Sequence, residues 1–409
     1  MKIVHVNYSD SQGGAAIAVK RIHDLMLKNN INSNVVVSER ILDNDKVFSN
    51  NKNPKGIDST FRKALSRQLK YIFKTNNKFT HSLNLVPSNL INLINSLNPD
   101  YVNLHWIGNE TISIANIENL KAKIIWTLHD MWPFCGAEHY AINERFVNGY
   151  NKNNRPDDEK GIDVNRYIWK KKLKHFKKIE KIICTSKWMY DNAKKSYLFK
   201  NKNITEIPLA IDPNFWKPLS KKKSKNFFGI EENTKIILYG AENFLKNRRK
   251  GFNLFKETLK KYQDNFYSKF AIMLFGDEKH KLNDIENEFD KIKFVKLGRI
   301  TDEYTMKMAY SSADVVVIPS IVESFGLVAL EAIHCNAPCV VFDNTGLTSI
   351  IDHKENGYVA KYNSIDDLYN GIIWTLENFN NKNELIYKHA LQKFNHQKII
   401  QDYLNFIKK

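Results

Sequence analysis

The chain has 409 residues, more than one hydrophobic core usually organises, so we expect two domains. It has no run of eighteen apolar residues, and its start, MKIVHVNYSDSQGG, lacks a long apolar stretch. These features argue against a membrane-spanning or secreted protein and predict a cytoplasmic one. The formal net charge of +18 predicts an anionic partner, which could be nucleic acid, a phospholipid surface or a phosphorylated substrate.

In the first half of the chain, short apolar runs alternate with segments of helical periodicity. The first run, residues 2–8, leads to a turn at Gly13 and Gly14 and then to a helical pattern over residues 15–30. Further strands are predicted at residues 34–39, 101–106, 123–129 and 181–186. Residues 212–229 interrupt the alternation with two prolines and a run of lysines, a composition typical of an interdomain linker.

The second half of the chain repeats the same alternation. Its strands are predicted at residues 235–241, 270–276, 293–298, 314–320 and 338–343. Continuous apolar strands separated by helices imply parallel sheets that helices cover on both faces. We therefore predict an α/β protein with two doubly wound, Rossmann-like domains and a ligand site in the cleft beyond the carboxyl ends of their strands.

The predicted domain boundaries follow these changes in pattern. An N-terminal domain would span residues 1–212, and a C-terminal domain would span residues 213–383. Residues 384–409 are expected to form one or two helices that pack back toward the N-terminal domain. The four cysteines are scattered; Cys335 and Cys339 resemble half of a metal site without a second half, so we expect buried thiols.

The segment PSIVESFGLVALEA, residues 319–332, carries the strongest chemical signal. The preceding strand is predicted to end at Ile318, and Ser324 is predicted to cap a helix over residues 325–333. The first backbone amides of that helix would be free to bind an anion, with Gly326 allowing a phosphate to approach. These amides belong to Phe325, Gly326 and Leu327.

Two glutamates would flank this anion. Glu323 lies just before the predicted helix, and Glu331 lies about two turns into it. A carboxylate accepts two hydrogen bonds from a vicinal diol, so the pair suits a ligand in which a diphosphate joins a sugar to a ribose. A helix cap with a surface glutamate is the alternative. A hydrolase would need the two carboxylates to face each other across a bond.

Three consecutive cations, Arg248, Arg249 and Lys250, precede Gly251 at the start of a helical pattern. The helix dipole disfavours cations at that end, and a bound diphosphate would offset the cost. A solvated basic turn is the alternative.

In the first half, His129 and Asp130 end a predicted strand, the position where catalytic residues of such sheets collect. A structural histidine is the alternative. Gly13 and Gly14 lie at the first strand-to-helix turn, but SDSQGGAA lacks the three-glycine spacing of a dinucleotide-binding loop, which argues against an NAD enzyme.

Taken together, these residues resemble a family. PSIVESFGLVALEAIHCNAPCVVFDNTG, followed by ENGYVA, is similar to the donor-binding region of the retaining glycosyltransferases of family four, whose hallmark is two glutamates separated by seven residues. GGAAIAVKRIH, TLHD, IPLAIDPNFWKP and RKGF are similar to further segments of that family. The resemblance covers nearly the whole chain and implies the two-domain GT-B fold.

The resemblance also implies roles for single residues. Glu331 would bind the ribose and Glu323 the transferred sugar, while Lys250 and an adjacent arginine, Arg249 or Arg248, would hold the diphosphate. Phe325, Gly326, Leu327, Arg299, Gly13 and Gly14 complete the expected donor site. His129, Glu323 and Lys250 are the expected catalytic residues.

The implied reaction retains the anomeric configuration without a protein nucleophile or a metal. The triplet Asp43 to Asp45 matches the signature of metal-dependent transferases, but such triplets are frequent and GT-B enzymes use cationic side chains instead. We therefore expect no cofactor and no metal. The nucleotide-sugar donor is a substrate, and the acceptor is expected to be a glycan or a lipid-linked glycan in cell-envelope polysaccharide synthesis, such as O-antigen, capsule or lipopolysaccharide.

A basic amphipathic helix is predicted over residues 61–78, which could dock on the anionic inner face of the cell membrane. An ordinary core-packing helix is the alternative there. Two other functions remain open at this point: a nucleotide-sugar epimerase of similar fold, and a basic nucleic-acid-binding protein. Aromatic residues interleaved with the basic runs are too few to favour nucleic acid.

Overall fold

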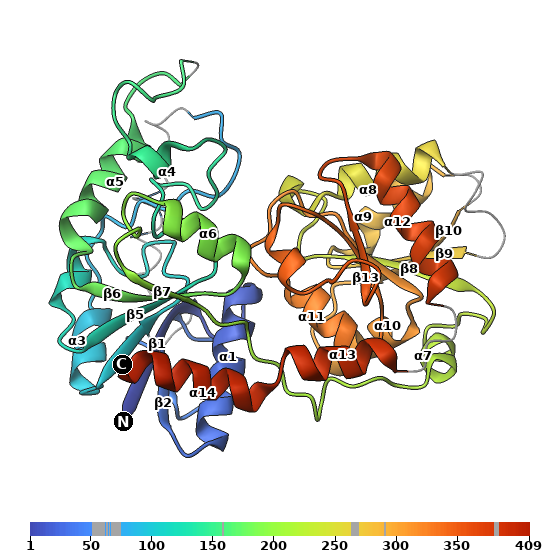
Figure 1. Cartoon of the computed structure of the whole chain (residues 1–409), viewed down its shortest axis with the longest axis horizontal. Coiled ribbons are helices and arrows are strands. Elements are labelled where there is room, and N and C mark those ends of the chain that lie inside the picture. The colour runs from blue at the N-terminus through green and yellow to red at the C-terminus, as the bar shows by residue number, and fades with distance from the viewer. Residues whose placement is uncertain are drawn as a thin grey trace. The chain divides into compact units, whose positions relative to one another are not determined.

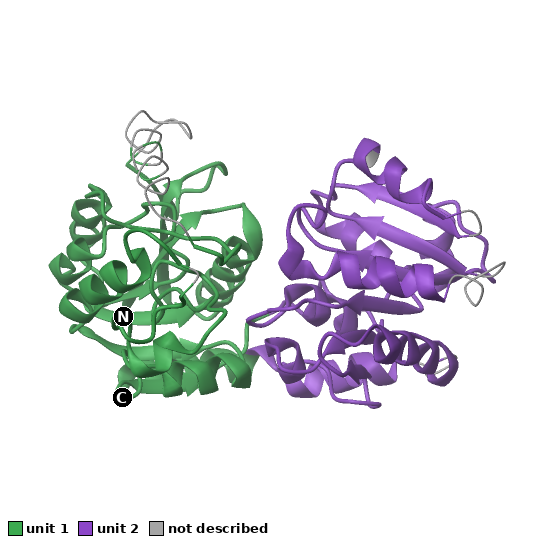
Figure 2. Ribbon diagram, turned by 90° about the horizontal axis from the view of Figure 1, so that it is seen from above, with its two compact units in different colours: residues 1–210, 397–409 green, residues 211–396 purple. Residues whose placement is uncertain are grey.

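A computed structural model describes residues 1–50, 62, 64, 66, 75–157, 159–262, 270–289, 292–379 and 384–409. The chain folds into two compact units (Figure 2). Unit 1 contains residues 1–210 and 397–409, and unit 2 contains residues 211–396. The chain therefore passes from one unit to the other twice, after Ala210 and after His396.

A parallel sheet forms the centre of unit 1. Within the described residues its strands follow the order β3-β2-β1-β4-β5-β6-β7. The strands are β1 (Lys2–Ser9), β2 (Asn32–Glu39), β3 (Val47–Phe48), β4 (Tyr101–Leu104), β5 (Lys123–Leu128), β6 (Ile179–Cys184) and β7 (Asn203–Glu206). The order reverses between β1 and β4, which is the point where ligands of such sheets bind.

Helices cover this sheet (Figure 1). They are α1 (Gly13–Lys28), α3 (Leu90–Ser96), η1 (Ala115–Asn119), α4 (Arg145–Asn148), α5 (Val164–His175), α6 (Lys187–Lys195) and α14 (His396–Lys408). The last helix, α14, belongs to the core of unit 1, because its Ile399, Ile400 and Ile407 cluster with Ile3 of β1 and Met26 of α1. The end of the chain thus lies on the same face of the sheet as α1.

A buried polar network ties α14 to this face. Asn103 of β4 donates one amide hydrogen bond to Tyr403 Oη of α14 at 2.7 Å and another to Thr127 Oγ1 of β5 at 2.9 Å. Both protons of the Asn103 amide are thereby satisfied, and its side chain is fully buried. The hydroxyl of Tyr403 therefore stabilises unit 1 beyond the apolar packing of its ring.

Unit 2 is built around a second parallel sheet. Its described strands follow the order β10-β9-β8-β11-β12-β13. They are β8 (Lys235–Gly240), β9 (Phe270–Phe275), β10 (Lys293–Gly298), β11 (Val315–Ile318), β12 (Cys339–Phe342) and β13 (Gly357–Ala360). The helices of this unit are α7 (Lys221–Phe227), η2 (Arg248–Lys250), α8 (Phe252–Lys261), α9 (Lys279–Glu286), α10 (Glu303–Ser312), α11 (Leu327–His334), η4 (Gly346–Ser349), α12 (Ile365–Asn378) and α13 (Leu385–Lys393).

These two sheets confirm the predicted α/β class. The strands predicted from apolar runs all form, whereas β3, β7 and β13 were not predicted. Of these, β3 has only two residues, and β7 has no buried residue in its sequence NITE, so neither shows an apolar run. All four cysteines are free and buried, as expected.

The lysine run, predicted as part of an interdomain linker, forms a helix of unit 2. These lysines form α7, whose first turn is capped by Ser220 Oγ accepting from the amide of Lys223. Lys221 Nζ and Lys225 Nζ lie 3.0 and 3.4 Å from the buried carboxylate of Asp314, at the start of β11. The pairing with Asp314, which follows only from the tertiary fold, lets the lysine-rich segment pack as a helix.

The basic helix predicted over residues 61–78 lies largely outside the described residues, and so do the contacts that would test it. Among the helices that are described, none combines the length and the apolar character needed to cross a bilayer.

Replacing Tyr403 by Phe tests the α14 network. The substitution leaves one buried N–H of Asn103 without an acceptor, so the free energy of unfolding should fall by about 1–3 kcal/mol. Urea denaturation followed by circular dichroism measures the loss. The matched control is Tyr167→Phe, at an exposed tyrosine of α5, which should change stability little. Equal effects of the two substitutions would contradict the assignment.

Candidate active site

The candidate site of unit 2 begins at the turn between η2 and α8. Gly251 separates them with a φ of +70°, a left-handed conformation that favours glycine. A Cβ atom at this position would lie 1.7 Å from the carbonyl oxygen of Pro319. The amide of Ile321 also donates to the carbonyl of Arg249 at 2.8 Å. The η2 turn is therefore held directly against the loop that follows β11.

This contact brings the two predicted motifs together. Lys250 Nζ lies 2.7 Å from Glu323 Oε2, and Arg249 Nη1 lies 3.2 Å from the same oxygen. Arg249 Nη1 also donates to the carbonyl of Val322 at 2.8 Å. Arg248, in contrast, is exposed. The geometry thus places Arg249 rather than Arg248 beside Glu323, and the solvated basic turn is not what forms.

The charges in this cluster shift one another's protonation. Burial by itself would raise the pKa of Glu323, but the cations of Lys250 and Arg249 outweigh burial and lower that pKa to about 2. The pKa of Lys250 is lowered by burial and by neighbouring Arg249, while Glu323 opposes both effects. Glu323 is therefore ionised at neutral pH, and the cluster carries one more positive charge than negative.

The prediction that Ser324 caps a helix beginning at Phe325 was wrong. Helix α11 begins at Leu327, its N-cap is Gly326 with a φ of +111°, and no side chain caps it. That φ lies outside the helical region, so the helix cannot extend back to Phe325. The first helical hydrogen bond joins the amide of Leu330 to the carbonyl of Gly326 at 3.1 Å. The amides without an intrahelical acceptor are consequently those of residues 327–329.

Glu331 also differs in position from the prediction. It is the fifth residue of α11, little more than one turn from the helix start, and 6% of its surface is exposed. The hydroxyl of Tyr310, in α10, donates to Glu331 Oε2 at 3.0 Å. The sequence gives no signal for this partner, because nothing in the local pattern relates α10 to α11.

Arg299 follows β10 and is not part of the Glu323 cluster described above. Its side chain is exposed, and Nη2 donates to Asn243 Oδ1 at 3.1 Å. Both residues follow strands of the same sheet, so Arg299 does lie at the carboxyl edge, as its place in the sequence suggests.

In unit 1, the predicted residues lie at the carboxyl edge near the reversal of strand order. Gly13 and Gly14 form the first turn of α1, with Gly13 at a φ of +81°, and Gln12 supplies no side-chain cap. His129 directly follows β5. Burial lowers the pKa of His129 to about 4, although neighbouring Asp130 opposes that shift.

The partners of His129 and Asp130 were not predicted. His129 Nε2 lies 2.9 Å from His105 Nδ1. Asp130 instead accepts from Trp106 Nε1 at 2.7 Å and contacts His139 Nδ1 at 2.5 Å. Burial opposes ionisation of Asp130, yet His139 and these hydrogen bonds lower its pKa. His105 and Trp106 follow β4, so a sequence pattern on β5 could not reveal them.

Comparison with known proteins places these residues in a family. The C-terminal part, residues 220–392, matches the model of glycosyl transferases group 1, and residues 47–215 match that of glycosyltransferase family 4. Together the two matches span most of the chain. The chain belongs to the family-four glycosyltransferases with the GT-B fold.

The chain is distantly similar to other proteins of this family. It is 28% identical over 260 residues to an uncharacterised glycosyltransferase of Methanocaldococcus jannaschii; the aligned stretch covers 62% of this chain and 64% of that relative. The structural alignment with sucrose-phosphate synthase from Thermosynechococcus elongatus covers the whole of this chain and 98% of that chain, with a TM-score of 0.68 and 14% identity. Anabaena HepE, solved in complex with UDP and glucose, covers both chains fully, with a TM-score of 0.63 and 15% identity. At these identities the structures confirm the fold alone.

The Glu323 cluster predicts a pH-dependent stability. Because the pKa of Glu323 in the folded state is about 2 rather than 4.5, its contribution is complete above pH 4.5 and is lost as the pH falls toward 2. Glu323→Gln should therefore reduce the free energy of unfolding at pH 7 by about 2 kcal/mol. The difference from the parent protein should shrink on acidification.

Urea titrations at a series of pH values measure this difference. Glu257→Gln, at an exposed position of α8, is the matched control and should give a small difference that does not change with pH. A Glu323→Gln difference that stays constant between pH 7 and pH 3 would refute the ion-pair account.

Proposed function

We propose that the protein is a retaining glycosyltransferase that moves a sugar from a nucleotide-diphosphate donor to a hydroxyl group of an acceptor. The observation that carries this proposal is the cluster of Arg249, Lys250 and Glu323 at the carboxyl edge of the unit 2 sheet. Two cations held by one carboxylate leave an excess of positive charge beside the start of α11.

A diphosphate fits this arrangement. Its oxygens take hydrogen bonds from a guanidinium, an ammonium and the first amides of a helix, all of which favour anions. When the diphosphate binds, Lys250 and Arg249 turn from the carboxylate to the phosphate oxygens. Glu323 is then released to accept hydrogen bonds from hydroxyl groups of the transferred sugar, close to the diphosphate that carries it.

Glu331 would bind the two hydroxyl groups of the ribose. One oxygen of its carboxylate accepts from Tyr310, which fixes the orientation of the group before the ligand arrives. A carboxylate that accepts from a vicinal diol uses the remaining lone pairs of its two oxygens. Tyr310 is thus a positioning residue in this proposal.

The reaction breaks the bond between the anomeric carbon of the sugar and the phosphate oxygen. Lys250 and Arg249 stabilise the negative charge that develops on the departing diphosphate. A hydroxyl group of the acceptor attacks the anomeric carbon from the same face, and its proton passes to the departing phosphate oxygen, so the configuration is retained. Because the two cationic side chains supply the charge, we expect no metal requirement.

The donor and acceptor classes are also part of the proposal. HepE was solved with UDP and glucose, which supports a nucleotide-sugar donor. The family match favours transfer over the epimerase and the nucleic-acid-binding protein considered above. A glycan or lipid-linked acceptor, a role in envelope polysaccharide synthesis and a location at the inner face of the membrane remain predictions from the sequence. The same holds for the assignment of His129, Gly13 and Gly14 to the reacting centre.

A thermal-shift panel tests the donor site. UDP-, GDP-, ADP- and CMP-sugars are added to the parent protein and to Lys250→Ala and Glu331→Ala, and the midpoint of unfolding is measured against ligand concentration. One class of donor should stabilise the parent. Each substitution should weaken binding of that donor at least tenfold. A tenfold change corresponds to a loss of only about 1.4 kcal/mol, which the loss of one charged hydrogen-bonding group can supply.

Glu377→Ala, at an exposed position of α12, is the control and should leave the ligand-induced shift unchanged. If Lys250→Ala and Glu331→Ala bind the donor as the parent does, the site assignment is wrong. If a donor is converted without acceptor to an isomeric nucleotide sugar, the epimerase takes the place of the transferase.

A further inference from the structure

A basic pocket lies at the amino edge of the unit 1 sheet, where β4, β5 and β6 begin. Its volume is about 220 Å³, far more than the about 10–15 Å³ that one water molecule needs. Four lysines and one glutamate are among the residues that line it: Lys121, Lys123, Lys178, Lys181 and Glu180. The proposed transferase reaction uses none of these residues.

Strand register brings two of the lysines together. Lys123 begins β5 and pairs with Tyr101 of β4, and Lys181 of β6 pairs with Ile125, two residues after Lys123. Paired residues of neighbouring parallel strands point to the same face of the sheet, and so do residues two apart in one strand. The side chains of Lys123 and Lys181 therefore project from the same face. The register shift between β5 and β6 leaves Glu180 without a partner in the ladder.

The cations of this pocket contact neutral acceptors. Lys178 Nζ donates to the carbonyl of Glu118. Lys181 Nζ donates to the carbonyls of Phe406 and Ile407, at the end of α14, at 3.0 and 2.8 Å. Within the described part of the chain, none of the four lysine side chains forms an ion pair. Four lysines against one glutamate leave a net charge of +3 around the pocket.

The lysines also repel one another. Burial lowers the pKa of Lys181, and the charge of Lys123 lowers it further, whereas Glu180 opposes both effects. Lys123 and Lys181 are therefore close enough for each to be affected by the charge of the other. An anion bound between them would offset this repulsion.

We propose that the pocket binds the terminal phosphate group of a phosphomonoester. Such a group carries a charge of about −1.5 to −2 at pH 7 and presents three acceptor oxygens. An ammonium group has three N–H donors, so Lys178 and Lys181 keep donors for the phosphate after their carbonyl contacts. Lys121 and Lys123 contribute theirs from the exposed rim.

The shape of the site favours a small phosphate ester over nucleic acid. A phosphodiester of a nucleic acid carries a single charge and lies within a continuous backbone, so it does not enter a pocket. Apolar side chains, including Leu120 and Ile124, also line the pocket and leave room for a carbon body attached to the phosphate. This chemistry has two sources: a soluble phosphate ester, or a phospholipid whose head group is a phosphomonoester.

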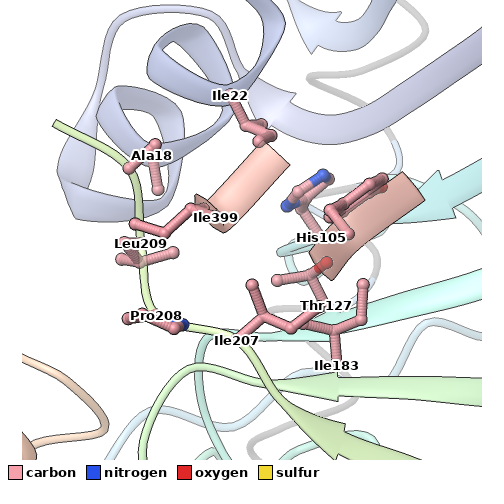
Figure 3. A pocket seen from close by; sticks show the side chains of 11 residues that line it. Ala18, Ile22, His105, Thr127, Ile183, Ile207, Pro208, Leu209 and Ile399 are labelled. Carbon is pink, nitrogen blue, oxygen red and sulfur yellow. The ribbon is translucent and has the colours of Figure 1, made fainter. Parts of the chain in front are cut away.

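A second cavity of unit 1 shows what this site requires (Figure 3). Its lining is mainly aliphatic, with Ile22 of α1 and Ile399 of α14 beside His105, and it contains no lysine or arginine. Its volume of about 20 Å³ has room for about one water molecule. Size and charge together therefore distinguish the basic pocket as the anion site of this unit.

The pocket is also separate from the proposed reacting centre. Lys123 begins β5, whereas His129 directly follows its last residue. Six residues of extended strand correspond to roughly 20 Å, at about 3.3 Å per residue. A phosphate ester in the pocket therefore leaves the carboxyl edge of the sheet accessible to other ligands.

Isothermal titration calorimetry of the full chain with glycerol 3-phosphate tests the proposal. Lys121→Gln combined with Lys123→Gln removes two exposed ammonium groups and leaves the carbonyl contacts of α14 in place, so this variant should fold. It should bind glycerol 3-phosphate at least tenfold more weakly than the parent. The matched control, Lys152→Gln combined with Lys160→Gln, removes the same charge at exposed positions of unit 1 and should bind as the parent does.

Lys250→Ala distinguishes this pocket from the donor site of unit 2. It removes a cation beside Glu323 and leaves the basic pocket unchanged, so it should retain the binding of glycerol 3-phosphate. Binding that is lost in Lys250→Ala and kept in the Lys121/Lys123 variant would overturn the proposal. No binding by the parent, or equal binding by the parent and the Lys121/Lys123 variant, would overturn it as well.

Co-sedimentation with vesicles distinguishes the two sources of the phosphate. Phosphatidylcholine vesicles are prepared with and without phosphatidic acid, whose head group is a phosphomonoester. Binding that requires phosphatidic acid and is lost in the Lys121/Lys123 variant assigns the pocket to a lipid head group. Binding of glycerol 3-phosphate without such vesicle binding assigns it to a soluble ester. Because no readout measures sugar transfer, a failure here is distinct from a failure of the proposed function.

Discussion

The carboxylate of Glu323 holds together two cations that would otherwise repel each other. Arg249 and Lys250 lie on adjacent positions of a short turn, and the partly buried site gives them little solvent screening. One carboxylate oxygen of Glu323 lies within 3.2 Å of both cationic groups and balances part of their charge. Removing this carboxylate would leave two partly buried cations without a compensating anion. The glycine at position 251 makes this contact possible, since any side chain there would collide with Pro319.

In both units, the candidate binding and catalytic residues lie where the strands of a parallel sheet end. In unit 2 these are a charge cluster and the start of α11, which suit a charged ligand. In unit 1 the corresponding edge carries His129, whose Nε2 contacts the buried imidazole of His105. The two edges differ in charge: unit 2 carries an excess of positive charge, whereas burial lowers the pKa of His105 and of His129 in unit 1 and so favours neutral rings.

The sequence was informative where the determinant is local. Apolar runs predicted most strands of both sheets. The place of Glu323 just before one predicted helix, and of the cations at the start of another, predicted the side chains of the candidate site. It failed where the determinant is a contact between distant segments. The φ of Gly326, the Tyr310 partner of Glu331 and the His105 partner of His129 depend on register and packing, which no local pattern encodes.

The proposed function requires Arg249 and Lys250 to exchange Glu323 for a diphosphate. A crystal structure of the chain with the nucleotide diphosphate of its donor tests this exchange directly. We expect phosphate oxygens within hydrogen-bonding distance of Lys250 Nζ and the Arg249 guanidinium. A nucleotide bound elsewhere, with both cations still paired to Glu323, would contradict it.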